Sequence, residues 1–354
     1  MILTVTLNAA LDVTYRVDRL RPHTSHRVRS VAERAGGKGI NVARVLHALA
    51  RETTGQDSVR PGTVRRDTVE HEVVVTGLAG GAAGAALREE LATAGLRDRL
   101  VPIAGSSRRT VAVVDEQAGD TTILLEPGPV VTDAEWAHFL DWFDRLLPRA
   151  AALVLAGSLP GGVPADAYAV LLRRARAHGV PAVLDADGAP LLAGLAEAPA
   201  VVKPNAAELT AATGESDPWA AARALRAAGA RAVVASLGAD GLIAVTSQGS
   251  WQVRPPRRLA GNPTGAGDAA VAALALGLIT QAPWPVRLAQ AVALSAAAVA
   301  APLAGDFDHA VYRGLLDQLD VTPSPPFSPP FSPPCSPACS PPSSPENSRA
   351  ADRH

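Results

Sequence analysis

The stretch Asn262-Pro263-Thr264-Gly265-Ala266-Gly267-Asp268 runs directly into the apolar segment 269–279, and this junction constrains the fold more than any other part of the chain. Segment 269–279 has no polar residue, so a helix formed by it must be buried on all sides. Just before it, the backbone N–H groups of Gly265, Ala266 and Gly267 can converge on one anion at the helix start. The sequence therefore predicts an anion site mounted on a buried helix.

Asp268 falls in the first turn of this helix, beside the expected anion. A carboxylate there would repel a phosphate, but it can accept the proton of a hydroxyl that attacks the phosphorus. The alternative is a glycine-rich turn in which Asp268 serves as a helix N-cap. This motif alone leaves both interpretations open.

Short β-branched runs alternate with segments of helical period along residues 1–320, which predicts an α/β fold with a doubly wound, mostly parallel sheet flanked by helices. We expect strands at 2–7, 73–77, 152–156, 182–185, 201–203 and 233–236, and helices at 39–49, 82–94, 165–178, 190–196 and 219–228. Each expected helix can cover one face of the sheet.

Two hairpin-like segments, within about 12–30 and 108–126, interrupt the alternation. Their strands are half polar, as expected of a small sheet with one wet face. We expect pairs of 13–17 with 26–30 and of 109–115 with 121–125. These segments predict a small β lid over the carboxyl edge of the main sheet, where open α/β folds bind ligands.

Two further segments differ in composition from the rest of the chain. Residues 51–72 are polar, Arg-rich and aperiodic, which indicates a surface insertion. Residues 321–354 form a Pro/Ser-rich tail, expected to be disordered, and contain both cysteines, Cys335 and Cys339. Residues 1–320 therefore have no disulfide framework, thiol nucleophile or cysteine metal site.

The charge and the apolar segments limit the expected partners. A net charge of −1 offers no electrostatic reason to expect nucleic acid or membrane lipid as a partner. Residues 2–7 look like a strand without a preceding basic segment, so we expect no signal peptide. The apolar stretch 288–304 is interrupted by Gln290 and Ser295 and fits a core helix better than a membrane span. We expect a soluble, cytoplasmic protein.

A second glycine-rich helix start reads Gly36-Gly37-Lys38-Gly39-Ile40-Asn41. The glycines allow a ligand to approach the backbone, and Lys38 and Asn41 carry side-chain donors. Asp12 follows the first strand and could accept from two sugar hydroxyls, although an aspartate there is often a turn residue.

Taken together, GGKGINVARVL and NPTGAGDAAVAALALGL resemble the paired signatures of the ribokinase-like, phosphofructokinase B sugar kinases. Three further segments match that family in the expected order, at 156–162, 202–208 and 236–241. The resemblance spans residues 1 to about 318. It implies a ribokinase-like kinase domain that uses ATP and Mg²⁺.

The resemblance also implies roles at the phosphate end of the site. Asp268 would be the catalytic base, and the transferring phosphoryl group would lie against Gly265, Ala266 and Gly267. Asn205 and Glu208 would hold Mg²⁺ through water. The ATP-binding residues would be Asn205, Ser236, Gly238 and Gly241.

At the sugar end, the resemblance implies contacts from Asp12, Gly37, Lys38, Asn41 and Ser158. The segments 107–111 and 126–129 resemble the branch that phosphorylates sugar phosphates, the 1-phosphofructokinase and tagatose-6-phosphate kinase type, although Thr110 stands where that branch has Asn. Arg27, Lys38 and Arg108 would then surround the substrate phosphate. The implied reaction converts fructose 1-phosphate to fructose 1,6-bisphosphate, or phosphorylates tagatose 6-phosphate.

Two other functions fit the same fold. A kinase for an unphosphorylated sugar or a nucleoside would not need Arg27 and Arg108. A non-catalytic sugar- or nucleotide-binding regulator would not need Asp268, Asn205 and Glu208, whose presence favours the kinase. The resemblance further implies that the lid forms the contact of a homodimer.

Overall fold

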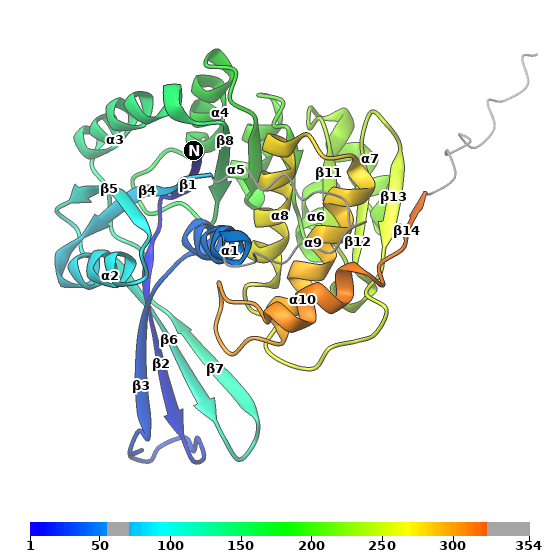
Figure 1. The fold of residues 1–354 in the computed structure, drawn as a ribbon. Coiled ribbons are helices and arrows are strands. Elements are labelled where there is room, and N and C mark those ends of the chain that lie inside the picture. The colour runs from blue at the N-terminus through cyan, green and yellow to red at the C-terminus, as the bar shows by residue number, and fades with distance from the viewer. Residues whose placement is uncertain (55–70, 324–354) are drawn as a thin grey trace, which may run out of the picture. The chain divides into compact units, whose positions relative to one another are not determined.

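The computed structural model describes residues 1–54 and 71–323, so the 324–354 tail and most of the expected 51–72 insertion lie outside the described residues. The described chain forms a ten-stranded sheet (Figure 1). Its strands, in spatial order, are β14 (Val321–Pro323), β13 (Ser250–Val253), β12 (Leu242–Val245), β11 (Val233–Ser236), β10 (Val201–Val202), β9 (Ala182–Asp185), β8 (Ala152–Ala156), β1 (Ile2–Thr6), β4 (Val73–Gly80) and β5 (Arg97–Ile103). Neighbours from β11 to β5 are parallel, whereas β12, β13 and β14 add antiparallel strands at one edge.

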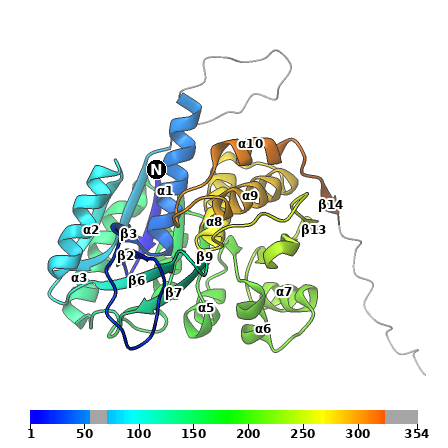
Figure 2. The same ribbon diagram turned by 90° about the horizontal axis from the view of Figure 1, so that it is seen from below.

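Helices cover both faces of this sheet, as Figure 2 shows from below. One face carries α1 (Lys38–Thr54), α2 (Gly81–Thr93), α8 (Ala266–Thr280), α9 (Trp284–Val299) and α10 (His309–Leu316). The other carries α3 (Asp133–Leu146), α4 (Ala167–Ala177), α5 (Gly188–Leu195), α6 (Ala206–Thr213) and α7 (Pro218–Ala227). Each face has its own hydrophobic core, which confirms the predicted doubly wound α/β fold.

Helix α8 is deeply buried over its first half. Residues 269–275 are at most 1% exposed, and the helix packs between α1 and α9. Its alanines keep the side chains short, so both neighbouring helices can approach closely. The expectation of a helix buried on all sides is confirmed for residues 269–275, whereas Leu276, Leu278 and Ile279 nearer its end are only partly buried.

A second sheet has the strand order β3–β2–β6–β7, formed by β3 (Ser30–Gly36), β2 (Ala10–Val17), β6 (Arg108–Asp115) and β7 (Asp120–Leu125). The pairing of 13–17 with 26–30 was wrong, because β2 pairs with β3 from Ala10 opposite Gly36 to Arg16 opposite Ser30. The charged and small residues of β3 lack a strand pattern of their own, and the neighbouring strand imposes their extended form. The lid sheet starts directly after β1 and just after β5, at the carboxyl edge of the main sheet.

Other boundaries also differ from expectation. Strand β14 pairs with β13 through Val321, Thr322 and Pro323, so these residues belong to the sheet and not to a disordered tail. Helix α1 continues to Thr54, so residues 51–54 of the expected insertion are helical. Strands β5 and β13 had no clear sequence signal, because polar residues interrupt their alternation. Helix α3 was missed although its signal was available, since a capping box of Thr132 and Glu135 is followed by Trp136, Phe139 and Phe143 at helical spacing.

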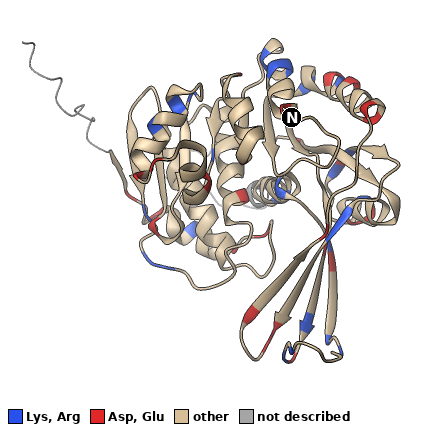
Figure 3. Cartoon of the chain, turned by 180° about the vertical axis from the view of Figure 1, so that it is seen from behind, with Lys and Arg blue, Asp and Glu red and all other residues tan. Residues whose placement is uncertain are grey.

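The apolar stretch 288–304 contributes to α9, which packs against α8 and α10. Within the described ranges, the structure contains no helix of the length and apolarity that a membrane crossing needs. Figure 3 shows basic and acidic residues interspersed over the helices and the lid, so no large region of either sign stands out in this view.

The register of β1 and β4 can be tested at Gly77. It lies opposite Thr6 on β4 with φ +147°, and a Cβ there would lie 1.9 Å from the Thr6 carbonyl oxygen. We therefore expect Gly77→Ala to lower the free energy of unfolding by about 3 kcal/mol or more, measured by urea denaturation. The control Gly179→Ala also has positive φ, at +70°, but open space around it, so it should cost only about 1 kcal/mol. Equal losses would contradict this register.

Candidate active site

Asp268 is held at the start of α8 by a hydrogen bond from α1. Gly265 is the N-cap residue of α8 with φ +87°, which places Asp268 in the first helical turn. The carboxylate is 6% exposed, and Asn41 Nδ2 donates to its Oδ2 at 2.8 Å. Two glycine-rich helix starts that are far apart in the sequence thus meet at one carboxylate.

Burial raises the pKa of Asp268 to about 7, and the nearby carboxylate of Asp185 acts in the same direction. The hydrogen bond from Asn41 and the charges of Lys38 and Lys203 oppose that rise. A carboxyl with this pKa is basic enough to accept a proton near neutral pH and is ionised in a large share of molecules.

Two lysines and two carboxylates surround this base. Lys38 Nζ lies 3.2 Å from Asp185 Oδ1 and 3.8 Å from Glu208 Oε1, and Lys203 Nζ lies 3.6 Å from the same Asp185 oxygen. Burial acts to lower the pKa of Lys38, but Asp185, Glu208 and Asp268 together raise it, so the ammonium is retained. Asp185 is 1% exposed and Lys203 4%, and each neutralises part of the other's buried charge.

Asp185 and Lys203 were missed as site residues by the sequence analysis. Asp185 is the last residue of β9 and Lys203 directly follows β10. A charged residue at the carboxyl end of a buried parallel strand is a signal for this position, because such ends meet at the ligand-binding edge of the sheet. That signal was available in the sequence.

One backbone donor at the start of α8 is engaged within the chain. The N–H of Ala266 donates to the Pro263 carbonyl at 3.2 Å, and its contact with an anion stays a prediction. Within the described residues, the N–H groups of Gly265 and Gly267 donate to no protein acceptor. A Cβ at Gly267 would lie 3.4 Å from Lys203 Nζ, so the lysine ammonium lies beside Gly267. The start of α8 therefore combines two backbone donors with a nearby positive charge.

Asn205 and Glu208 form a capping box at the start of α6. Asn205 Oδ1 accepts from the Glu208 N–H at 2.9 Å, and Glu208 Oε2 accepts from the Asn205 N–H at 2.9 Å. The other oxygen, Glu208 Oε1, faces Lys38. No group of three His, Cys, Asp or Glu side chains able to hold a metal occurs in the described part of the chain. Glu208 Oε1, the oxygen outside the capping box, is a carboxylate donor of the kind that contacts Mg²⁺ through water.

The expected nucleotide residues lie on two neighbouring strands. Ser236 ends β11, and its backbone pairs with that of Asn205 after β10. Gly238, with φ +61°, follows in a short 3₁₀ turn. Gly241 has φ +83°, and a Cβ there would meet the Val253 carbonyl at 2.0 Å, so this glycine is required for the turn into β12. Asn205 and Ser236 are thus brought together, with the glycine turn directly after them.

At the opposite end, Asp12 lies at the base of the lid. On β2 it stands across from Arg34 of β3 and Thr110 of β6. Burial raises the pKa of Asp12, while a hydrogen bond with Thr110 and the charges of Arg108, Arg34 and Arg44 oppose the rise. Gly37, with φ +114°, has space only for a hydrogen, since a Cβ would lie 2.6 Å from Thr6 Cγ2.

Arg108 and Ser158 are joined through Asn8. Arg108 Nε donates to the Asn8 carbonyl at 3.2 Å, and Asn8 Nδ2 donates to Ser158 Oγ at 3.1 Å. The side-chain oxygen of Asn8 is buried without a hydrogen-bond partner. A Cβ at Gly128 would lie 2.3 Å from that oxygen, which places the 126–129 segment against the same site. Sequence reasoning missed Asn8.

The structure does not bring Arg27 to Lys38 and Arg108 within one chain. Arg27 is exposed in the segment between β2 and β3, beyond the Arg16–Ser30 end of the hairpin. Arg108, in contrast, pairs with Ala10 at the other end of β2. Strand residues rise about 3.3 Å each, so the length of β2 separates the two guanidinium groups. The expected cluster of three cations was therefore wrong for a single chain.

Several known proteins are similar to this chain in sequence and in fold. A 1-phosphofructokinase from Xanthomonas campestris pv. campestris is 38% identical over 289 residues, which cover 79% of this chain and 85% of that protein. Phosphofructokinase-2 from Escherichia coli in complex with fructose-6-phosphate is 27% identical, with a TM-score of 0.76 over 90% of this chain and 98% of that one. A possible 1-phosphofructokinase from Thermotoga maritima is 26% identical, with a TM-score of 0.76 over 92% and 99%.

The sequence pattern of the pfkB family carbohydrate kinases matches residues 3–309, which include both glycine-rich helix starts and the base of the lid. The predicted resemblance is thereby confirmed. From this match and the arrangement around Asp268, the chain belongs to the pfkB family of carbohydrate kinases and is an ATP-dependent phosphotransferase with an alcohol group as acceptor.

Proposed function

We propose that this kinase transfers the γ-phosphoryl group of ATP to a hydroxyl of a ketohexose phosphate. Fructose 1-phosphate, giving fructose 1,6-bisphosphate, is the first candidate, and tagatose 6-phosphate is the second. The observation that carries the transfer chemistry is the buried Asp268 carboxylate, held by Asn41 at a helix start beside Lys38 and Lys203. The 38% identity with a 1-phosphofructokinase supports the choice of sugar.

In the proposed reaction, Asp268 accepts the proton of the attacking hydroxyl as the oxygen approaches the γ-phosphorus. The N–H groups of Gly265 and Gly267 and the ammonium of Lys203 stabilise negative charge on the phosphoryl oxygens. Lys38 lies between Asp185 and Glu208 and adds a second positive charge. These donors are in place before the reaction, so little reorganisation is needed.

Mg²⁺ and the nucleotide would occupy the side of the site formed by β10 and β11. Glu208 would bind Mg²⁺ through water with the oxygen that the capping box leaves free, and Asn205 would assist. When bound, Mg²⁺ neutralises phosphate charge. Asn205, Ser236, Gly238 and Gly241 would line the ATP, and Asp185 would hold both lysines in position.

The sugar would lie between the start of α1 and the base of the lid. Asp12 and Asn41 would bind its hydroxyls, and Gly37 would allow close approach to the backbone. Arg108 would bind the substrate phosphate, because its guanidinium is positioned by Asn8 next to Ser158. Thr110, which bonds both Asp12 and Arg108, would orient the two groups.

We further propose a homodimer formed through the lids, in the cytoplasm, where ATP is available. Val31 on β3 is 56% exposed, and Ile123, Leu124 and Leu125 on β7 are 50–69% exposed. Val31 and Leu124 lie on one face of the lid sheet, because Val31 is in register with Tyr15, Val113 and Thr122, whereas Ile123 and Leu125 lie on the other face. Exposed apolar side chains on this small sheet favour a protein partner. Arg27 lies at the far end of the lid, so in such a dimer it could reach the active site of the second chain.

Substrate choice is tested first with ATP and Mg²⁺ against fructose 1-phosphate, fructose 6-phosphate, tagatose 6-phosphate, fructose, ribose and adenosine, by ADP release. We expect turnover only with a phosphorylated ketohexose. Arg108→Gln should raise its KM about 10- to 100-fold, because one charged hydrogen-bonding partner of the phosphate is lost. Arg109→Gln, which removes only an exposed pair with Glu126, should leave KM near the parent value. Turnover of unphosphorylated compounds alone would contradict the assigned sugar.

The role of Asp268 is tested by Asp268→Asn, which keeps the size and removes the base. We expect kcat to fall about a hundredfold to ten-thousandfold with ATP binding retained, measured by steady-state kinetics and calorimetry. The exposed Asp166→Asn is the matched control.

In the unmodified enzyme, kcat/KM should fall as pH drops through about 7, because the protonated carboxyl of Asp268 cannot accept a proton. A flat acid limb down to pH 5 would exclude Asp268 as the base.

The dimer is tested by sedimentation velocity of the full chain. We expect Leu124→Glu to dissociate it, because a charge enters the apolar face of the lid. Leu192→Glu is the control, since Leu192 is 49% exposed on α5, away from the lid. A parent chain that sediments as a monomer at micromolar concentration would refute the proposal.

A further inference from the structure

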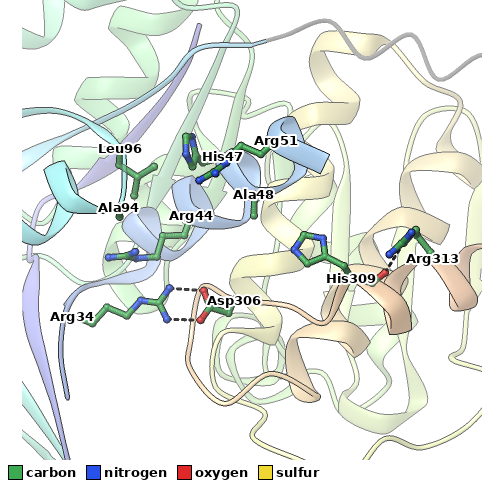
Figure 4. Close-up of a pocket in the computed structure, with 10 residues that line it drawn as sticks. All are labelled: Arg34, Arg44, His47, Ala48, Arg51, Ala94, Leu96, Asp306, His309 and Arg313. Atoms are coloured by element: carbon green, nitrogen blue, oxygen red, sulfur yellow. Dashed lines mark hydrogen bonds and ion pairs between the residues drawn. The ribbon is translucent and has the colours of Figure 1, made fainter. Parts of the chain in front are cut away.

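Arg34 on β3 lies between two carboxylates at the base of the lid. On β2, Asp12 stands directly across from it, so both side chains project from the same face of the lid sheet. The second carboxylate is Asp306, in the segment before α10. Nη1 of Arg34 donates to Asp306 Oδ2 at 2.7 Å, and a second bond joins Nη2 to Oδ1, as the dashed lines of Figure 4 show. The guanidinium therefore pairs with Asp306 rather than with its cross-strand neighbour.

The carboxylate of Asp12 lies within electrostatic reach of Arg34. Burial raises the pKa of Asp12, and the charge of Arg34 is among those that oppose the rise. Within the described residues, however, Arg34 forms an ion pair with Asp306 and none with Asp12. Asp12 Oδ2 lies over Gly36, where a Cβ would be only 1.9 Å from it, next to the start of α1. The carboxylate thus keeps lone pairs for the hydroxyls of a ligand.

The two carboxylates compete for one guanidinium. Opposite charges directly across neighbouring strands attract each other, and the attraction is stronger where less water surrounds them. Burial is the largest influence on the pKa of Asp12, whereas the side chain of Asp306 is 43% exposed. A guanidinium released from Asp306 would therefore be drawn to Asp12. A two-pronged pair there would occupy both Asp12 oxygens, which are the acceptors that sugar hydroxyls need.

Asp306 is held in place by a packed turn. Its N–H donates to the Leu303 carbonyl at 3.2 Å. The preceding Gly305 has φ +81°, and a Cβ there would lie 2.9 Å from Arg44 Cδ and 3.2 Å from Asn41 Oδ1. The backbone of this turn therefore packs against α1. The body of the protein thus fixes the position at which Asp306 meets the lid.

We propose that Asp306 is a positioning residue for sugar binding. By pairing with Arg34, it prevents Arg34 from pairing with Asp12, so that both Asp12 oxygens remain available to hydroxyls of the sugar. The inference rests on the proposed function, in which Asp12 binds the sugar. Because the competition concerns Asp12 alone, loss of the Asp306 charge weakens the binding of the sugar and leaves that of ATP unchanged.

The test measures, by steady-state kinetics on the full chain, the KM of ATP and the KM of the sugar that the parent enzyme phosphorylates. Asp306→Asn should raise the KM of the sugar about tenfold or more, because its hydroxyls must then displace the charged hydrogen bonds of Arg34 from Asp12. Arg34→Gln should stay within about threefold of the parent, because it removes only a partly exposed ion pair. The double variant should return to the same range, because no guanidinium remains to compete. The KM of ATP should not change.

Asp98→Asn is the matched control, because Asp98 of β5 forms a similar ion pair, at 2.7 Å, with Arg88 of α2. It should leave both KM values near those of the parent. The double variant separates the proposed mechanism from a structural role, since a fold damaged by the loss of Asp306 would not recover when Arg34 is removed as well. A double variant with a KM as high as that of Asp306→Asn would overturn the proposal, as would a tenfold rise with Arg34→Gln alone.

Asp12→Asn separates this inference from the proposed function. It should raise the KM of the sugar, and adding Asp306→Asn should then have no further effect, because no carboxylate remains at that position to attract Arg34. A parent enzyme that phosphorylates none of the sugars, or an Asp12→Asn variant with the parent KM, would contradict the proposed function. A KM that rises with Asp12→Asn but not with Asp306→Asn would overturn the inference alone.

Discussion

The hydrogen bond from Asn41 to the buried carboxylate of Asp268 is the interaction on which the site depends. It joins the starts of α1 and α8, two helices that pack against each other beside the buried, alanine-rich part of α8. The burial that packs these helices also raises the pKa of Asp268 to about 7. Packing and base strength therefore have one physical cause.

Keeping charges in this dry region requires partners from other strands. Asp185 is the last residue of β9, and its Oδ1 lies within 3.6 Å of the Nζ atoms of both Lys38 and Lys203. Glu208 of α6 lies near Lys38 as well. A buried ion pair contributes little net stability, because desolvation offsets the attraction. Its value here lies in positioning two ammonium groups where phosphoryl charge would develop.

The lid is attached to this arrangement at its base. Asp12 of β2 stands between Arg34 and Thr110 in the lid sheet, and Arg34 reaches Asp306 before α10. The ends near Ala10 and Gly36 are thus held by the body of the protein, while the apolar residues of β7 remain exposed. The ion pair of Arg34 with Asp306 therefore connects the base of the lid to the segment before α10.

The α/β fold and the buried helix that follows Gly267 could be predicted from the residues alone, because both follow from local periodicity. The kinase family followed from the resemblance of two glycine-rich motifs to known sugar kinases, and that resemblance also implied that Asp268 lies near the start of α1. Which charges meet depends instead on how the strands and helices pack. Asp185 and Lys203 lie at the site, and Arg27 lies at the far end of the lid. The N–H of Ala266 donates to a carbonyl of its own turn. The positions of the strand residues follow from strand order and register, which non-local packing sets. The pairing of Arg34 with Asp306 could not be predicted either, because it joins β3 to the segment before α10, which no local sequence pattern connects.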